Sequence, residues 1–202
     1  MNPTFLAILS IAAAAPATAQ DVAPAQALGL DDSRGARRVA LGVEVDLLPP
    51  VMSAVAGTAG FSGQAWAGEG HWRLRLVGAH FRYPDGLLDS DAFSRRDATV
   101  LALICDRFLL PGFRGPWVGA GAEIWWSSIG DVAGPQRADW TQAVLTVGGG
   151  YVWKVWGNLY LNPWAAAHWT TTDRTLTLYG NTFHPARLSA EASLKVGWFL
   201  WM

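Results

Sequence analysis

The chain has a single cysteine, Cys105, in 202 residues, so an intrachain disulfide framework is excluded as a source of stability. Its formal net charge is -1, which excludes both the basic excess typical of nucleic-acid-binding proteins and a polybasic patch for a membrane surface. Past the amino terminus the sequence lacks any apolar run of the ~20 residues that a transmembrane helix needs. A disulfide scaffold, a nucleic-acid binder and a helical membrane protein are therefore all disfavoured.

The amino terminus has the features of an export signal. Residues 1–20 carry no charged side chain, and Leu6 begins an apolar run that is too short to span a membrane. The run ends at Pro16, and a small-x-small cleavage site follows at 17–19. We predict a signal peptide over 1–20, a flexible periplasmic leader over 21–36 rich in Ala, Pro, Asp and Gly, and one domain over 37–202.

Tryptophan and glycine are abundant. The chain contains 12 Trp and 22 Gly, and 51% of its residues are hydrophobic. Abundant Trp and Gly with no hydrophobic 20-residue segment is typical of a transmembrane β-barrel, because each of its strands is only half apolar. A water-soluble barrel remains the alternative at this level.

Hydrophobic residues recur with period two, which predicts strands. In the segment VALGVEVDLL the odd positions from Val39 to Leu47 are apolar, and Glu44 and Asp46 lie on the other face. The same alternation runs through the last fifteen residues, 188–202. We predict eight antiparallel strands, at about 38–48, 57–67, 71–83, 98–108, 117–126, 141–156, 159–171 and 188–202.

The connections alternate between short and long, as in an up-and-down barrel of the outer membrane. The short ones are 67–70, 109–116 and 157–158, and the long ones are near 49–56, 84–97, 127–140 and 172–187. Two positions do not fit a regular strand pattern. Adjacent Asp106 and Arg107 require a bulge if both point inward, and Pro163 lacks a ladder donor and predicts a bulge or break.

Tryptophans on the apolar face fall at the strand ends, where the interface girdles of a membrane barrel lie. A lipocalin-like core gives no reason for this placement. The predicted girdle residues near the short turns are Trp72, Trp153 and Trp198, and those near the long loops are Trp126 and Trp169.

The carboxyl terminus resembles the last strand of outer-membrane β-barrels, which carries an insertion signal. Its pattern is a polar residue, a glycine two positions later, and hydrophobic residues at the third-last and last positions. Lys195, Gly197, Leu200 and Met202 match this pattern, although Met202 replaces the usual terminal Phe. In architecture the chain resembles the small eight-stranded barrels of the OmpA/OmpX type. This resemblance implies a bacterial outer-membrane location, with outer-membrane lipid and the barrel assembly machinery as partners.

Charged residues on the polar face are predicted to fill the lumen. Eight strands leave an interior just wide enough for side chains, and buried charges must pair. We expect an ion-pair network that closes the lumen, and a narrow small-solute channel is the alternative. The predicted members are Glu44, Asp46, Arg75, Glu123 and Lys195.

His168 is the residue that supports an enzyme hypothesis. Glu191 and Ser189 on the next strand are predicted to lie near it, and Thr170 follows two residues later. Histidine, a carboxylate and a hydroxyl are the groups needed for nucleophilic catalysis, and the spacing is similar to that of the outer-membrane lipid A deacylases. However, the alternation points His168 inward, away from lipid, so a structural His–Glu hydrogen bond is the preferred interpretation.

The sequence therefore predicts an all-β, eight-stranded, antiparallel up-and-down transmembrane barrel of the bacterial outer membrane. Its expected role is a structural or surface-interaction scaffold, without cofactor, metal or nucleic acid. The alternatives are a lipid-modifying enzyme that uses His168 and Glu191, and a narrow channel.

Overall fold

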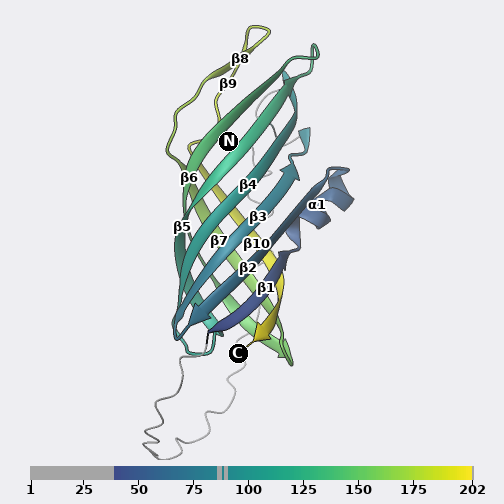
Figure 1. Cartoon of the computed structure of the whole chain (residues 1–202). Helices are drawn as coiled ribbons and strands as arrows, with labels where there is room; N and C mark the ends of the chain where they lie inside the picture. Colours follow the sequence, from purple (N-terminus) through teal and green to yellow (C-terminus); the bar gives the residue numbers. More distant parts are fainter. Residues whose placement is uncertain (1–38, 86–87, 89–90, 202) are drawn as a thin grey trace, which may run out of the picture. The chain divides into compact units, whose positions relative to one another are not determined.

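The computed structural model describes residues 39–85, 88 and 91–201, and the expected signal peptide, the leader and Met202 lie outside this part of the chain. Eight strands close into an antiparallel barrel in the order β1-β10-β7-β6-β5-β4-β3-β2 (Figure 1). The predicted fold class is thereby confirmed. The barrel strands are β1 Ala40–Asp46, β2 Gly60–Glu69, β3 Trp72–Arg82, β4 Phe93–Phe108, β5 Gly115–Asp131, β6 Arg137–Trp156, β7 Leu159–Thr170 and β10 Leu188–Trp201.

The long connections are more ordered than the sequence predicts. The segment 127–140 is mostly strand, because β5 continues to Asp131 and β6 begins at Arg137. The last long connection holds a small hairpin, β8 Leu176–Leu178 and β9 Asn181–Phe183. The prediction that these segments are loops is wrong where they form strands. The reason is that their apolar residues form a core of their own, which consists of Phe93, Ile129, Trp140, Leu178 and Phe183.

A helix that the strand pattern does not predict follows β1. Helix α1 spans Leu48–Ala56, with proline in its first turn and Gly57 at its end in the left-handed conformation, φ 65°. Proline fits the first turn because the N–H it lacks has no partner there, and glycine adopts positive φ without strain. None of its residues is buried, and it lies beside the upper end of β2 (Figure 1).

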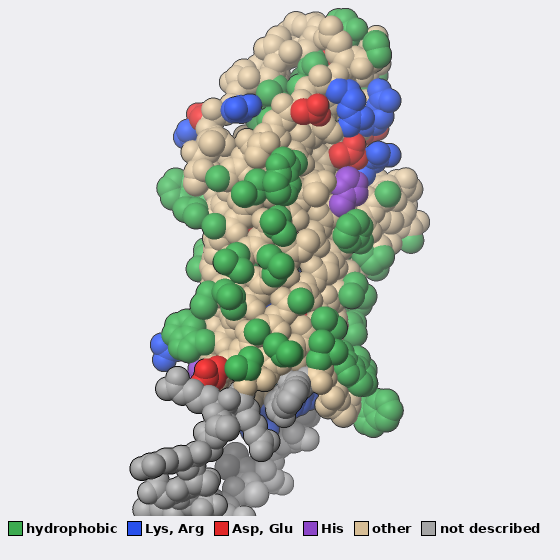
Figure 2. All heavy atoms as spheres, viewed as in Figure 1, with side chains coloured by type: hydrophobic (Ala, Val, Ile, Leu, Met, Phe, Trp, Pro, Cys, Tyr) green, Lys and Arg blue, Asp and Glu red, His purple; other side chains and the backbone are tan. Residues whose placement is uncertain are grey.

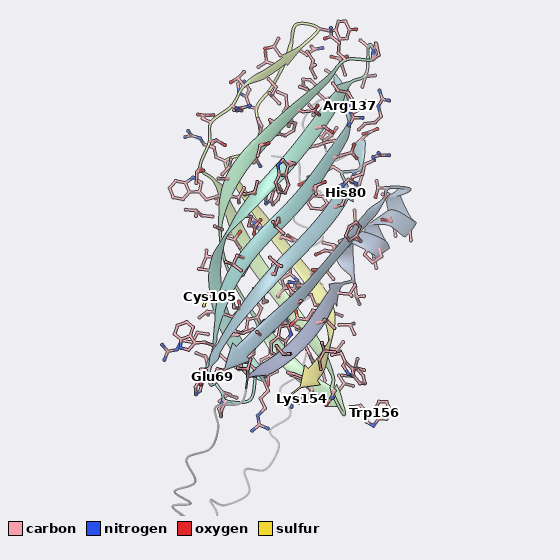
Figure 3. The ribbon with its side chains drawn as sticks, in the orientation of Figure 1. Glu69, His80, Cys105, Arg137, Lys154 and Trp156 are labelled. Atoms are coloured by element: carbon pink, nitrogen blue, oxygen red, sulfur yellow. The ribbon has the colours of Figure 1, made fainter. Side chains whose placement is uncertain are left out.

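Side chains alternate between the lumen and the outer surface. Strand β1 is buried and exposed at strictly alternate residues, and its exposed side chains are apolar. Figure 2 shows hydrophobic side chains over the middle of the visible face and charged ones toward its two ends. In Figure 3, Cys105 lies nearer the short-turn end, where Glu69 and Lys154 are found, and Arg137 lies at the other end. This is the reverse of a water-soluble barrel and matches the apolar outer band of a transmembrane one.

Among the described residues, no helix is both long and apolar enough to cross a membrane.

The bulge that two inward charges at Asp106 and Arg107 would require is absent. Asp106 is buried in the lumen, whereas Arg107 points outward with its guanidinium 5.3 Å from the ring centre of Trp72. Both residues keep the regular pairing with β3 and β5, because only one of the two charges has to be accommodated inside. The irregularity in β4 lies instead between Ser94 and Asp97.

Pro163 interrupts one ladder without a change of register. It pairs regularly with Leu194 of β10. Toward β6, the pairs pass from Gly150↔Trp164 directly to Trp153↔Leu161, so the ladder is broken beside the proline. The predicted break is present and the predicted bulge is absent at this position, since a missing N–H removes a hydrogen bond but adds no residue.

Candidate functional site

The lumen contains two groups of polar side chains. We call the first, near the short-turn end, the lower network: Glu44, Gln64, Arg73, Arg75 and Asp106. We call the second, toward the long-loop end, the upper cluster: Glu123, Trp125, Thr146, His168 and Glu191. The two groups come from strands far apart in sequence, and the closure of the barrel brings them together.

The lower network is a chain of ion pairs across the lumen. Arg73 Nη1 lies 2.7 Å from Glu44 Oε1, and Arg73 Nε lies 2.7 Å from Asp106 Oδ2. Arg75 reaches the same carboxylate from its Nε, at 2.7 Å, and its Nη2, at 2.8 Å. The four side chains are at most 5% exposed. Two guanidiniums and two carboxylates thus balance in charge where water is excluded.

Hydrogen bonds saturate Glu44. It accepts one from the Tyr160 hydroxyl at 2.8 Å, one from Asn162 at 3.0 Å, and one from the Gln64 amide. Trp66 Nε1 in turn donates to the Tyr160 hydroxyl at 2.8 Å. A buried carboxylate needs this number of donors to offset the loss of its hydration.

Aromatic rings close the lumen below the lower network. The Arg73 guanidinium lies 4.9 Å from the ring centre of Phe108 and 5.3 Å from that of Trp117, distances typical of cation–π contacts. These rings belong to a buried cluster that also contains Trp66, Phe113, Tyr160 and Phe199. Ions and rings together fill this end of the barrel.

The predicted lumen residues Asp46 and Lys195 are buried, but their partners are not the oppositely charged side chains of the expected ion-pair network. Lys195 Nζ lies 3.3 Å from the Gln64 amide oxygen and 3.7 Å from the ring centre of Trp164. Among the described residues, no carboxylate oxygen lies within 4.0 Å of it. Asp46 accepts from the Ser193 hydroxyl, from Trp164 Nε1 at 3.1 Å and from the Leu48 amide at 3.0 Å.

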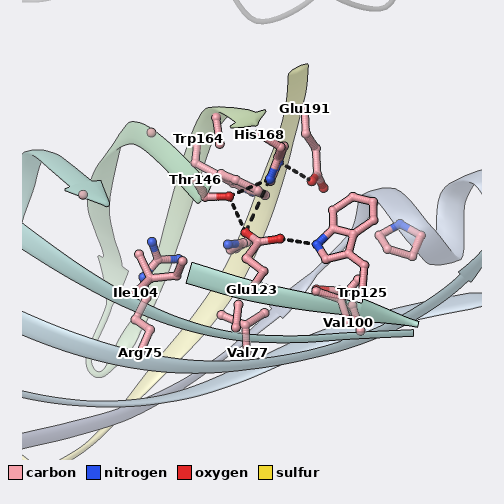
Figure 4. A pocket seen from close by; sticks show the side chains of 18 of the residues that line it. Arg75, Val77, Val100, Ile104, Glu123, Trp125, Thr146, Trp164, His168 and Glu191 are labelled. Carbon is pink, nitrogen blue, oxygen red and sulfur yellow. Dashed lines mark hydrogen bonds and ion pairs between the residues drawn. The ribbon is translucent and has the colours of Figure 1, made fainter. Parts of the chain in front are cut away.

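Glu123 also differs from its expected place, because it belongs to the upper cluster (Figure 4). Its carboxylate accepts from Thr146 Oγ1 and from Trp125 Nε1, and it lies 3.4 Å from His168 Nδ1. Thr146 Oγ1 is 2.7 Å from the same His168 nitrogen. The predicted single network is therefore two groups, since the stagger of the strands sets Glu123 nearer the long-loop end.

His168 lies inside the barrel and is 5% exposed. Its Nε2 is 3.4 Å from a Glu191 carboxylate oxygen and has no hydrogen-bond partner. The predicted hydroxyls are placed differently. Thr170 Oγ1 donates to Ala186 O, 3.4 Å away, and Ser189 is exposed in the strand position opposite His168. The hydroxyl that contacts His168 is Thr146, on β6.

The predicted girdle tryptophans all lie on the outer surface, from 43% exposed for Trp198 to 63% exposed for Trp153. Of the predicted insertion signal, Lys195 and Gly197 face the lumen, Leu200 is 61% exposed on the outside, and Met202 lies outside the described residues. A Cβ on Gly197 would overlap the ring of Tyr160. This glycine thus has a packing role in the closed barrel.

Sequence reasoning missed five site residues: Gln64, Arg73, Asp106, Trp125 and Thr146. The alternation of β3 places Arg73 on the same face as Arg75, so that signal was available. Nothing in the sequence near Asp106 or Thr146 indicates which residues they contact, because their partners are on other strands. Among the residues that the structure describes, no group of three His, Cys, Asp or Glu side chains is arranged to hold a metal ion.

Comparison with known proteins does not assign this chain to a family. No family model matches the sequence, and no curated protein matches it. A solved structure of a major outer membrane protein from Thermus thermophilus aligns over 82% of this chain and 100% of its own, with a TM-score of 0.47 and 13% sequence identity. A likeness of this size carries no argument about function.

Proposed function

We propose that this protein is a bacterial outer-membrane barrel, of the small OmpA/OmpX-type class, that acts as a scaffold presenting its long-loop end at the cell surface. Its lumen is closed by the lower network and does not conduct. The carrying observation is the buried chain of contacts from Glu44 through Arg73 and Asp106 to Arg75, which crosses the lumen.

The apolar outer surface supports the membrane location. Leu74, Leu76, Leu103, Val118 and Val147 are each about half exposed on the outside of the barrel. An exposed apolar band of this extent is unfavourable in water and favourable in hydrocarbon. Closure of the sheet leaves few unpaired backbone groups for the lipid to meet.

The long-loop end supports the surface role. Strands β4, β5 and β6 have 16, 17 and 20 residues, more than the ~9–11 that cross a membrane, so their ends project beyond it. The projecting part has its own apolar core around Phe93 and Phe183, which holds the β8–β9 hairpin. A rigid projection of this kind suits interaction at the cell surface.

Conductance across planar bilayers tests the closed lumen against the channel. We expect no ohmic conductance from the wild-type protein, and none from Arg73→Met once its folding has been shown by a heat-modifiable gel shift. A steady single-channel current from the folded wild type would overturn the closed lumen. Fractionation tests the location separately, since recovery in the soluble periplasm would contradict the membrane assignment.

The enzyme alternative has one supporting observation, the contact of Thr146 and Glu191 with the two ring nitrogens of His168. However, Thr146 donates its proton to Glu123, so in this arrangement His168 is not placed to activate it. We therefore keep the scaffold as the proposed function. Lipid A mass spectra that change with the protein, and not with a His168→Gln variant, would favour the enzyme instead.

A further inference from the structure

The barrel wall has a notch beside β1. Strand β1 has 7 residues, whereas its neighbour β10 has 14. Pairing between them ends at Asp46↔Lys195, with a last hydrogen bond from Leu47 N to Leu194 O at 3.0 Å. The upper part of β10, residues 188–193, pairs with β7 but extends past the end of β1 for roughly 20 Å at the usual rise per residue. On the other side of the notch, β2 begins at Gly60.

The edge of β10 faces this notch with unpaired backbone groups. Thr170 N donates to Arg187 O, so Arg187 turns its backbone groups toward β7. Successive residues of a strand turn their backbone groups to opposite sides, and the other odd-numbered residues of this part of β10 therefore also bond to β7. The even-numbered residues Leu188, Ala190 and Ala192 therefore turn their backbone groups toward the notch. Within the described chain, no residue of β1, β2 or α1 pairs with these three.

On the membrane location proposed above, the notch lies at the depth of the outer lipid leaflet. It opens from Leu188, which pairs with the girdle residue Trp169, and it ends at Leu194, which pairs with Pro163 midway down the wall. Helix α1 borders it on the β2 side: a Cβ on Gly60 would lie 3.2 Å from Pro49 Cβ. The segment 47–60 has no charged residue, and Val51 and Val55 are 55% and 81% exposed, which suits contact with lipid.

Behind the notch lies a cavity of about 70 Å³ (Figure 4). Pro49 and Ser62 line it on one side of the notch, and Glu191 lines it on the other. Its inner wall is apolar and is formed by Val77, Ala79, Phe81, Val100, Ala102 and Ile104. The upper cluster lines the rest of the cavity together with Arg75 and Lys195, and His168 Nε2 lies 3.4 Å from the Glu191 carboxylate.

We propose that the notch is a lateral entrance from the outer leaflet, and that the upper lumen accommodates the end of an acyl chain of a membrane lipid. An apolar wall beside a few polar groups is the usual lining of a small-molecule site. The size of the cavity suits the end of one chain and excludes a whole lipid. The inference goes beyond the scaffold role and rests on the membrane location proposed above.

Photo-crosslinking from the acyl chain tests this. The full protein is reconstituted into phosphatidylcholine vesicles in which some chains end in a diazirine, irradiated, digested and mapped by mass spectrometry. Strand β4 provides an internal control, because Leu101 and Leu103 face outward and Val100 and Ala102 face inward. We expect label on the outward pair and also on Val100 and Val77.

A cavity-filling variant makes the test specific. Ala102→Leu adds three carbons to the cavity wall and should lower labelling of Val100 at least about fivefold, because the added side chain occupies the space of the acyl chain. Its matched control is Ala122→Leu, on the outer face of β5 opposite Leu103, which should leave that labelling unchanged. A heat-modifiable gel shift shows that each variant is folded.

Each failure has a separate meaning. Label on Leu101 and Leu103 alone would overturn the lateral entrance and leave the membrane location intact. Absence of label from the outward pair as well would overturn the membrane location itself. Inward label that Ala102→Leu does not reduce would also overturn the proposal. Disulfide dimers of Ala190→Cys, made in a Cys105→Ser background, would assign the notch to a second copy of the chain.

Discussion

Arg73 and Asp106 form an ion pair of 2.7 Å between two side chains that are at most 1% exposed. They come from the start of β3 and the end of β4, and both side chains are buried in the lumen. Because Arg73 also binds Glu44, this one guanidinium joins three strands of the barrel. The lower network is therefore the main polar contribution to the closure of the lumen.

Loss of Arg73 should destabilise the barrel strongly. Arg73→Met leaves Glu44 without its cation, and an uncompensated buried charge costs about 3–5 kcal/mol. The free energy of unfolding in urea, measured in detergent or vesicles, should fall by that amount. Arg137→Met is the matched control, because Arg137 pairs with Asp97 at the exposed long-loop end and should contribute at most about 1 kcal/mol.

Neutralising Glu44 as well should restore part of this loss. In the double variant Glu44→Gln with Arg73→Met, no unpaired carboxylate remains at position 44, and the amide keeps the shape of the side chain. The double-mutant cycle should yield a coupling energy of about 1.5–3 kcal/mol. Strictly additive effects would show that the pair does not interact in the folded barrel.

Gly197→Ala should impair folding, although glycine and alanine differ by one methyl group. A Cβ at this position overlaps the ring of Tyr160, which is 0% exposed and held by hydrogen bonds to Glu44 and Trp66. Overpacking of this kind costs about 1–3 kcal/mol. Gly78→Ala is the control: nothing lies within 4 Å of the place that its methyl group would take, so its unfolding midpoint should not fall.

Deletion of Trp201 and Met202 should prevent assembly. The backbone of Trp201 pairs with Leu41 and is the last contact that closes β10 onto β1. Each backbone group left unpaired in lipid costs several kcal/mol. We expect degradation and no heat-modifiable band in membrane fractions. Normal levels of folded protein would contradict both the insertion signal and the need for this closing pair.

Chemical labelling of the native Cys105 tests the membrane location without any substitution. Its side chain is exposed on the outer face, opposite Leu74 and nearer the short-turn end of the barrel. In vesicles, a charged water-soluble maleimide should not modify it, since the reagent stays in water and does not enter the hydrocarbon. Unfolding in hot detergent should restore full labelling. Rapid labelling in intact vesicles would mean that this face is in contact with water.

A cysteine at the projecting hairpin serves as the positive control for this labelling. Asn181→Cys in a Cys105→Ser background places a thiol on β9, where the side chain is exposed. It should react with the same reagent in intact vesicles when the long-loop end faces the outside.

Much of the fold could be predicted from the sequence because a strand's two faces are encoded locally. The period of two assigns Glu44, Asp46, Arg75, Glu123, His168 and Lys195 to the lumen, and the structure has all of them buried there. Eight strands and their approximate limits follow from the same pattern. Helix α1 was missed because a nine-residue apolar segment with two prolines resembles a loop when read alone.

The inward or outward direction of each side chain can thus be read from the amino-acid sequence, since it depends only on near neighbours along the chain. The contacts among the inward side chains, in contrast, depend on the closed barrel. The stagger between strands sets Arg73 against Glu44 and Asp106, and it sets Thr146 and Glu123 against His168. Strand β1 does not cover the upper part of β10, because helix α1 begins at Leu48. The lumen contacts depend on the register of the closed sheet, which is fixed by the packing of all eight strands at once and not by any one of them.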